Sequence, residues 1–237
     1  MNSETLSDRP ISLLWHMEEF RARILKCVIS IIIMSCFAYS FVDRIFASLV
    51  KPVGRLVFIA PQEAFAARIK IAFFVGLFLS LPFLLYQAWK FISAGLKPKE
   101  KKYTLIFGPL SLLFFIAGTA FGYLIIVPVG IKFFLGFATS EIIPMITISK
   151  YVSFVGVLLV AFGVVFELPL ASLFLTKIGL VTPQFLSGKR KHAIVIIFIS
   201  AAIFTPPDVI TQSLMAIPLL VLYEVGIGFS KLAYKPG

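Results

Sequence analysis

The chain has 237 residues, of which 59% are hydrophobic and 14% are charged, and its mean hydropathy is +1.01. A water-soluble domain of this size does not need so much apolar surface, so the composition excludes soluble classes and indicates a polytopic membrane protein. The formal net charge of +11 does not predict a nucleic-acid partner, because the basic residues flank hydrophobic runs, as orientation signals do.

The chain is predicted to form one integral all-α membrane domain over residues 1–237. Residues 1–23 predict a cytoplasmic amphipathic helix, because Leu13, Met17 and Phe20 fall on one helical face. Six membrane spans are expected at about 24–42, 71–92, 104–127, 152–176, 193–204 and 213–229.

The last two predicted spans are short. The fifth has twelve residues, which gives roughly 18 Å of helix against a hydrocarbon core of roughly 30 Å. The tandem prolines of Thr205-Pro206-Pro207-Asp208 predict a turn, because proline cannot continue a helix. We therefore expect the bilayer to be thinner around this pair of spans.

The basic residues are divided unevenly between the two sides of these spans. If the amino terminus is inside, only seven of the 22 Lys and Arg residues lie in outer segments: Arg44, Lys51, Arg55, Arg68, Lys70, Lys132 and Lys150. The positive-inside rule then places both termini in the cytoplasm. The outer segments 43–70 and 130–150 are long and partly apolar, so we expect short interfacial helices there.

Glu19 lies among basic residues on another face of the amino-terminal helix. One interpretation is an intrahelical ion pair with Arg23, four residues on, worth about 0.2–0.5 kcal/mol. The other is that Glu19 binds a cationic ligand at the cytoplasmic surface. The residues alone leave both open.

Glu100 is the single acid in the run Lys97-Pro98-Lys99-Glu100-Lys101-Lys102. It either neutralises a solvated loop or forms, with Glu19 on the same side of the membrane, a site for two guanidinium groups. Each charge-assisted hydrogen bond in such a site contributes roughly 1.5–3 kcal/mol. A lysine ligand would lose the fork geometry, so the site would select arginine.

Glu167 lies near the middle of the fourth span, two residues before Pro169. An ionised acid at the bilayer centre costs roughly 2.5–3.5 kcal/mol. Glu167 is therefore expected either to be a neutral group bonded to a neighbouring helix or to line a wet cavity. An alternative function is a proton-coupled small-molecule carrier in which Glu167 titrates, although the chain has no internal repeat of the kind that carriers show.

Two polar residues, Thr205 and Gln212, lie at the outer end of the short pair, where they either cap the turn or bind a partner. The sequence contains no HExxH, no GxSxG and no phosphate-binding glycine loop, and it has only two histidines. We therefore predict no enzyme, no metal site and no cofactor.

Several short motifs occur in order along nearly the whole chain. The first, His16-Met17-Glu18-Glu19-Phe20-Arg21-Ala22-Arg23, is similar to the pattern HLxELRxR. The others are Pro61-Gln62-Glu63-Ala64-Phe65, Tyr86-Gln87 with Trp89 and Phe91-Ile92, Gly95-Leu96 before Glu100, Phe162-Gly163 through Glu167-Leu168-Pro169, Thr205-Pro206-Pro207-Asp208 with Gln212, and Ala216-Ile217-Pro218 through Tyr223-Glu224. Together they resemble the TatC family, the multi-spanning receptor subunit of the twin-arginine protein translocase.

The resemblance implies a concave, glove-like bundle in the bacterial cytoplasmic (inner) membrane that binds the twin-arginine signal peptides of folded proteins. By position, Glu19 and Glu100 match the acids that the family uses for the arginine pair, and Arg21 and Phe91 match residues that support that surface. Export in the family is driven by the protonmotive force, with no nucleotide site.

The resemblance also implies partners within the membrane. Glu167 matches the family's intramembrane acid, which lines the concave face. Thr205 and Gln212 match the outer polar patch where small single-span subunits of the TatA and TatB type dock. Self-association of the chain in the lipid bilayer is implied as well.

Overall fold

The computed structural model of the chain describes residues 13–51, 53–54, 56–139, 141, 143–204 and 209–234. Regular structure in these ranges is helical, apart from one parallel bridge between Val57 and Thr147. The helices are α1 (Leu13–Tyr39), α2 (Val42–Val50), α3 (Pro61–Ala94), α4 (Lys101–Phe121), the π-helix η1 (Gly122–Ile126), α5 (Val127–Leu135), α6 (Ile148–Lys177), α7 (Pro183–Gly188), α8 (Arg190–Phe204) and α9 (Val209–Ala233).

Five segments of the described helices are long and apolar enough to cross a membrane: Met17–Tyr39, Pro61–Ala94, Lys101–Leu135, Ile148–Lys177 and Gln212–Ala233. They overlap the first four predicted spans and the sixth. The fifth predicted span corresponds to α8, which has 15 residues and is shorter than each of these five segments. The turn predicted at 205–208 lies outside the described residues.

Several helices extend beyond the predicted spans. α3 begins at Pro61, where proline at the first helical position is favourable because its missing N–H has no partner there. The third predicted span continues through η1 into α5 and ends at Leu135. Pro128 has no N–H to donate to the carbonyl of Leu124, and at this point the helix widens into a π turn instead of ending.

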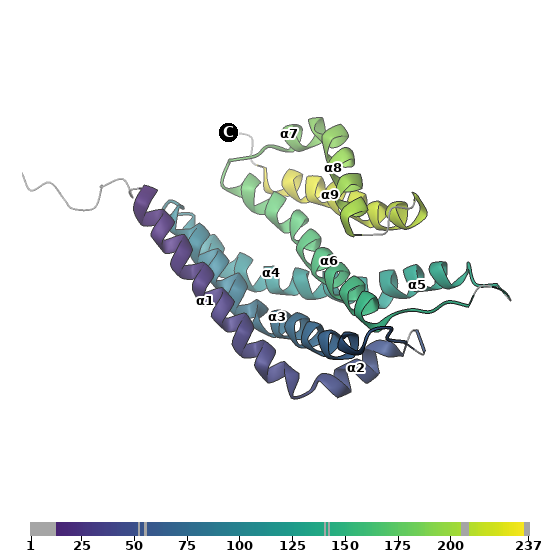
Figure 1. Cartoon of the computed structure of the whole chain (residues 1–237). Helices are drawn as coiled ribbons and strands as arrows, with labels where there is room; N and C mark the ends of the chain where they lie inside the picture. The colour runs from purple at the N-terminus through teal and green to yellow at the C-terminus, as the bar shows by residue number, and fades with distance from the viewer. Residues whose placement is uncertain are drawn as a thin grey trace, which may run out of the picture.

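α6 runs through the middle of the molecule and packs against α3, α4, α8 and α9, whereas α1 packs along α3 (Figure 1). The close crossings use glycine: a Cβ at Gly76 would overlap the backbone of Ser35 on α1, and one at Gly118 would overlap the carbonyl of Phe162 on α6. The main core lies around α6, where Phe162, Leu158 and Leu219 are almost fully buried.

The segment between α1 and α3 is fastened to the start of α6. Tyr151 donates a hydrogen bond to the carbonyl of Leu49 at 2.8 Å, and Val57 pairs with Thr147. The Lys70 ammonium donates to the hydroxyls of Ser149 and Ser153, each at 2.8 Å. The short helix expected in the first outer segment is thus present as α2, which covers this end of the bundle.

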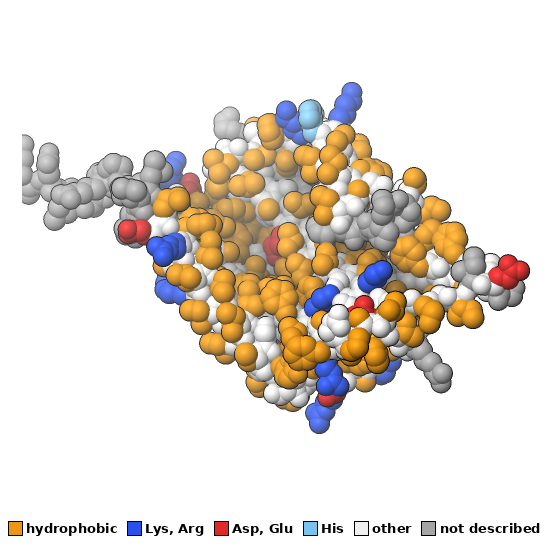
Figure 2. Space-filling view, viewed as in Figure 1, with side chains coloured by type: hydrophobic (Ala, Val, Ile, Leu, Met, Phe, Trp, Pro, Cys, Tyr) orange, Lys and Arg blue, Asp and Glu red, His pale blue; other side chains and the backbone are white. Residues whose placement is uncertain are grey.

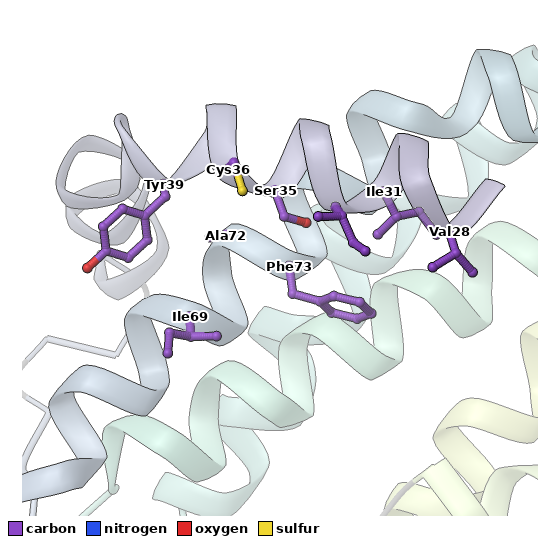
Figure 3. Close-up of a pocket in the computed structure, with 9 residues that line it drawn as sticks. Val28, Ile31, Ser35, Cys36, Tyr39, Ile69, Ala72 and Phe73 are labelled. Carbon is purple, nitrogen blue, oxygen red and sulfur yellow. The ribbon is translucent and has the colours of Figure 1, made fainter. Parts of the chain in front are cut away.

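One face of the molecule is hollowed between α1 and α3 on one side and α8 and α9 on the other (Figure 2). Hydrophobic side chains cover most of this face, and an acidic side chain lies inside the hollow. A separate apolar groove of about 680 Å³ lies between α1 and α3 and is lined by residues such as Ile31, Ser35 and Phe73 (Figure 3).

Candidate functional site

Glu19 lies near the start of α1 and forms an ion pair with Arg23, one helical turn further on. Both side chains are largely buried, with exposed fractions of 17% and 13%. The Arg23 guanidinium donates from Nε and from Nη2 to the Oε1 atom of Glu19, and the first of these bonds is 3.1 Å long. The intrahelical pair that the sequence offered as one interpretation is therefore present.

The same guanidinium reaches the neighbouring helix. Arg23 Nη1 donates to the side-chain Oε1 atom of Gln87 on α3 at 2.9 Å, and Gln87 is buried. The second carboxylate oxygen of Glu19, Oε2, is buried and has no hydrogen-bond partner. The acid is thus bonded through one oxygen only, and the other is an unused acceptor.

An aromatic contact joins the same two helices. The ring centroids of Phe20 on α1 and Phe91 on α3 are 5.4 Å apart, at an interplanar angle of 48°. Arg21, which follows Phe20 on α1, is exposed. The structure therefore brings Glu19, Arg21 and Phe91 together at the end of the bundle where α1 begins and α3 ends (Figure 1).

Glu100 follows the end of α3 and directly precedes α4, at the N-cap position. Its Oε2 atom accepts a hydrogen bond from the backbone N–H of Lys97 at 3.1 Å, which closes the tight connection between the two helices. The ion pairs of the described residues do not include Glu100. Glu100 lies at the same end of the bundle as Glu19, because both flank α3 where that helix ends.

Glu167 is half-buried on α6, and its Oε1 atom is buried without a hydrogen-bond partner. The nearby Ser111 hydroxyl on α4 interacts with its side chain. Ser111 also accepts a 2.9 Å hydrogen bond from the indole Nε1 of Trp89 on α3. Three helices thus contribute polar atoms to one place in an otherwise apolar bundle.

Gln212, on the first turns of α9, donates from Nε2 to the backbone carbonyl of Phe198 on α8 at 2.9 Å. This bond ties the two helices together near the connection between them. Thr205, the other residue of the predicted outer patch, lies outside the described residues.

Gln87, Ser111 and Trp89 are the site residues whose roles the sequence did not reveal. Their partners are distant along the chain: Gln87 binds a residue 64 positions earlier, and Trp89 binds one 22 positions later. Gln87 and Trp89 belong to one of the motifs that carry the family resemblance, but neither that motif nor a serine inside an apolar run indicates which residues they contact.

The comparisons with known proteins agree with one another. The family model described as Sec-independent protein translocase protein (TatC) matches residues 15–218. The TatC protein of Carboxydothermus hydrogenoformans is 42% identical over 231 residues, which cover 95% of both chains. The TatC protein of Aquifex aeolicus is 40% identical and covers 93% of this chain and 95% of its own. The TatCy protein of Bacillus subtilis is 35% identical, with coverage of 95% and 91%.

A crystal structure of the twin-arginine translocase receptor TatC superposes on this fold with a TM-score of 0.84, at 39% identity. It covers 92% of this chain and 99% of its own. The prediction of an all-α membrane fold with six membrane helices is confirmed.

The comparisons give no support to a small-molecule carrier that uses Glu167. They also indicate a transport role and not an enzymatic one, because the matching family is a protein translocase component. The chain belongs to the TatC family and is a multi-pass membrane component of the Sec-independent protein translocase, which works with other subunits of that system.

Proposed function

We propose that this chain is the receptor for twin-arginine signal peptides and the core of a translocase that exports folded proteins with energy from the protonmotive force. The observation that carries the proposal is the largely buried carboxylate of Glu19, which binds one guanidinium and keeps a second oxygen unpartnered. A buried acceptor without a hydrogen bond destabilises the protein. A ligand that donates a hydrogen bond to it removes this cost and so binds more tightly.

Glu100 is the second acid of this site. It faces the same end of the bundle, and no guanidinium or ammonium group among the described residues is paired with it. Two separate carboxylates suit two consecutive arginines, because each guanidinium presents several N–H donors in a fixed planar arrangement that the lysine ammonium does not reproduce. Arg21 and Phe91 shape the surface between them.

The apolar part of the signal peptide enters the hollow face of the bundle near Glu167. This face is lined mainly by hydrophobic side chains (Figure 2), which match an apolar helix. The buried Oε1 atom of Glu167 supplies an acceptor for a polar group of the peptide or of a partner helix.

Partner subunits dock at the short helix α8 and at α9. Single-span subunits of the TatA and TatB type are the partners that fit this surface, with Thr205 and Gln212 as contact residues. Exposed apolar side chains on α8, such as Val195, Ile196 and Ile199, give an apolar helix a surface to pack on. We also propose that copies of this chain associate with one another.

The chain acts as one integral membrane domain in the bacterial cytoplasmic (inner) membrane, with both termini in the cytoplasm. The excess of basic residues in the segments assigned to the inner side supports this orientation. It places Glu19 and Glu100 on the side from which a precursor protein arrives.

The proposal is tested by photocrosslinking a twin-arginine signal peptide to membranes that contain the wild type, Glu19→Ala or Glu100→Ala. Each loss of a charge-assisted pair should reduce the crosslink by about tenfold. Glu18→Ala is the matched control, because Glu18 is an exposed acid next to Glu19. Crosslinks at the wild-type level in both test variants would refute the assignment of the site.

A further inference from the structure

The bond pattern around Arg23 differs from that of another arginine–glutamate pair among the described residues. Arg190 on α8 pairs with Glu224 on α9 through two parallel bonds, Nε to Oε1 at 2.7 Å and Nη2 to Oε2 at 2.9 Å. Arg23 directs the same two donors at a single oxygen of Glu19 and leaves Oε2 without a partner.

The two pairs also differ in a contact that Arg23 makes with Gln87. In the described part of the chain, the hydrogen bonds of Arg190 involve Nε and Nη2, whereas Nη1 of Arg23 also donates to the Gln87 side chain at 2.9 Å. A guanidinium is planar and rigid, so fixing Nη1 also fixes the direction of Nε and Nη2. Gln87 is buried with an exposed fraction of 7%, and α1 packs closely along α3, so its side chain is not free to follow Arg23.

We propose that Gln87 is a positioning residue that keeps one oxygen of Glu19 available for a substrate arginine. It does so by holding Arg23 away from the two-oxygen pairing that would close the carboxylate. This inference rests on the proposed function, because it assigns Glu19 to signal-peptide binding. It adds a residue on α3 whose contribution acts entirely through Arg23.

The chemistry of the site is consistent with two guanidinium groups on one carboxylate. A carboxylate offers about four lone-pair positions, and Arg23 occupies positions on Oε1 only. Arg23 neutralises Glu19 in the resting chain, and the Gln87 amide oxygen takes up part of the guanidinium's hydrogen-bonding capacity. The substrate arginine then bonds to Oε2 without displacing Arg23. Because Oε2 is buried, side chains at this end of the bundle must move when the peptide binds.

The test measures the affinity of the purified full-length chain, in nanodiscs, for a fluorescent twin-arginine peptide and for the same peptide with two lysines. Gln87→Leu removes the acceptor for Nη1, so Arg23 should close on both oxygens of Glu19 and weaken twin-arginine binding by about tenfold. The preference for arginine over lysine should fall by a similar factor. Gln87→Glu keeps an acceptor oxygen in place and should retain binding.

The decisive variant combines Gln87→Leu with Arg23→Lys. A lysine ammonium cannot form the fork that blocks Oε2, so twin-arginine affinity should return to within about threefold of the wild type. Gln62→Leu, at the exposed opposite end of α3, controls for the loss of a glutamine from this helix. Circular dichroism of each variant shows that the helices are intact.

The outcomes separate the two proposals. Unchanged affinity in Gln87→Leu, or a loss that Arg23→Lys does not reverse, would overturn the positioning role of Gln87. If Glu19→Ala also binds the peptide as tightly as the wild type, the failure lies in the proposed receptor site itself. Loss in Glu19→Ala together with no effect in Gln87→Leu leaves the receptor site in place and removes only this inference.

Discussion

Glu167 has a buried carboxylate oxygen that lowers the stability of the fold and that we propose is used in function. Its Oε1 atom is buried without a hydrogen-bond partner, although Ser111 lies close enough to interact with the side chain. A chain under selection for stability alone would place an apolar residue here, because an unsatisfied buried acceptor costs about 1–3 kcal/mol. We therefore propose that a peptide or a partner helix supplies a hydrogen-bond donor to this oxygen.

We expect Glu167→Gln to insert and fold normally but to lower the transport rate of a twin-arginine precursor by about tenfold, the equivalent of one lost hydrogen bond to a charged group. The amide keeps the size of the side chain and removes its capacity for charge. Transport into membrane vesicles, with the amount of folded chain measured in parallel, is the assay. Glu141→Gln is the control, because Glu141 is an exposed acid in the segment between α5 and α6. Full transport by Glu167→Gln would return this residue to a structural role.

Sequence reading identified the acids of the site but not the contacts that arrange them. Glu19, Glu100 and Glu167 could be selected because each is an acid in a basic or apolar setting. The pair between Glu19 and Arg23 was also foreseeable, because residues four apart share a helical face. The bond from Arg23 to Gln87 was not, because it depends on how α1 and α3 cross, and no local pattern encodes that crossing.

At the scale of elements, α1 is held to the bundle along one line. Only 6% of the residues in the most apolar stretch of α1 are buried inside the molecule. The contacts of α1 are mainly with α3. The two helices approach closely where Gly76 faces Ser35. Contacts of this kind replace the hydrophobic effect in a bilayer, since lipid tails are as apolar as the side chains they would cover.

Gly76→Ala should therefore lower the free energy of unfolding by about 1–3 kcal/mol, because the added Cβ meets the backbone of Ser35, which cannot rotate away. Gly228→Ala on α9 is the matched control: apart from its chain neighbours and the backbone of its own helix, no described atom lies within 4 Å of its added Cβ. That control should keep or slightly raise stability, since alanine is the better helix former. Unfolding in mixed detergent micelles measures both, and equal stability of the two variants would contradict the close-packing argument.

The lengths of the elements were less predictable than their number. Hydropathy located the apolar part of each span, whereas the polar turns at the ends of α3 and α9 are helical as well. Pro109, Pro169 and Pro218 all lie inside helices. Each removes one backbone hydrogen bond, a loss that neighbouring helices and local distortion can offset in a membrane protein. Proline was therefore a weaker stop signal here than it is in a soluble domain.

At the scale of the whole molecule, the proposed receptor site depends on the connectivity of the bundle. Glu19 and Glu100 are separated by two long helices in the sequence, yet both lie where α3 ends, because α1 and α3 run side by side and α4 begins at the same end (Figure 1). Glu141 lies beyond α4, η1 and α5, at the far end of that continuous helical segment. Positions 99 and 141 must therefore face opposite sides of the membrane whichever way the chain is inserted.

This separation gives a test of orientation that does not depend on transport. In a background with Cys27→Ala and Cys36→Ser, Lys99→Cys should react with a membrane-impermeant maleimide only after intact cells are opened. Glu141→Cys should react from outside before that, because the positive-inside rule assigns the segments that hold only seven of the 22 basic residues to the outer side. Labelling of position 99 from outside would show that the chain has the opposite orientation. Glu19 and Glu100 would then lie on the side away from arriving precursors, and the receptor site would lose its basis.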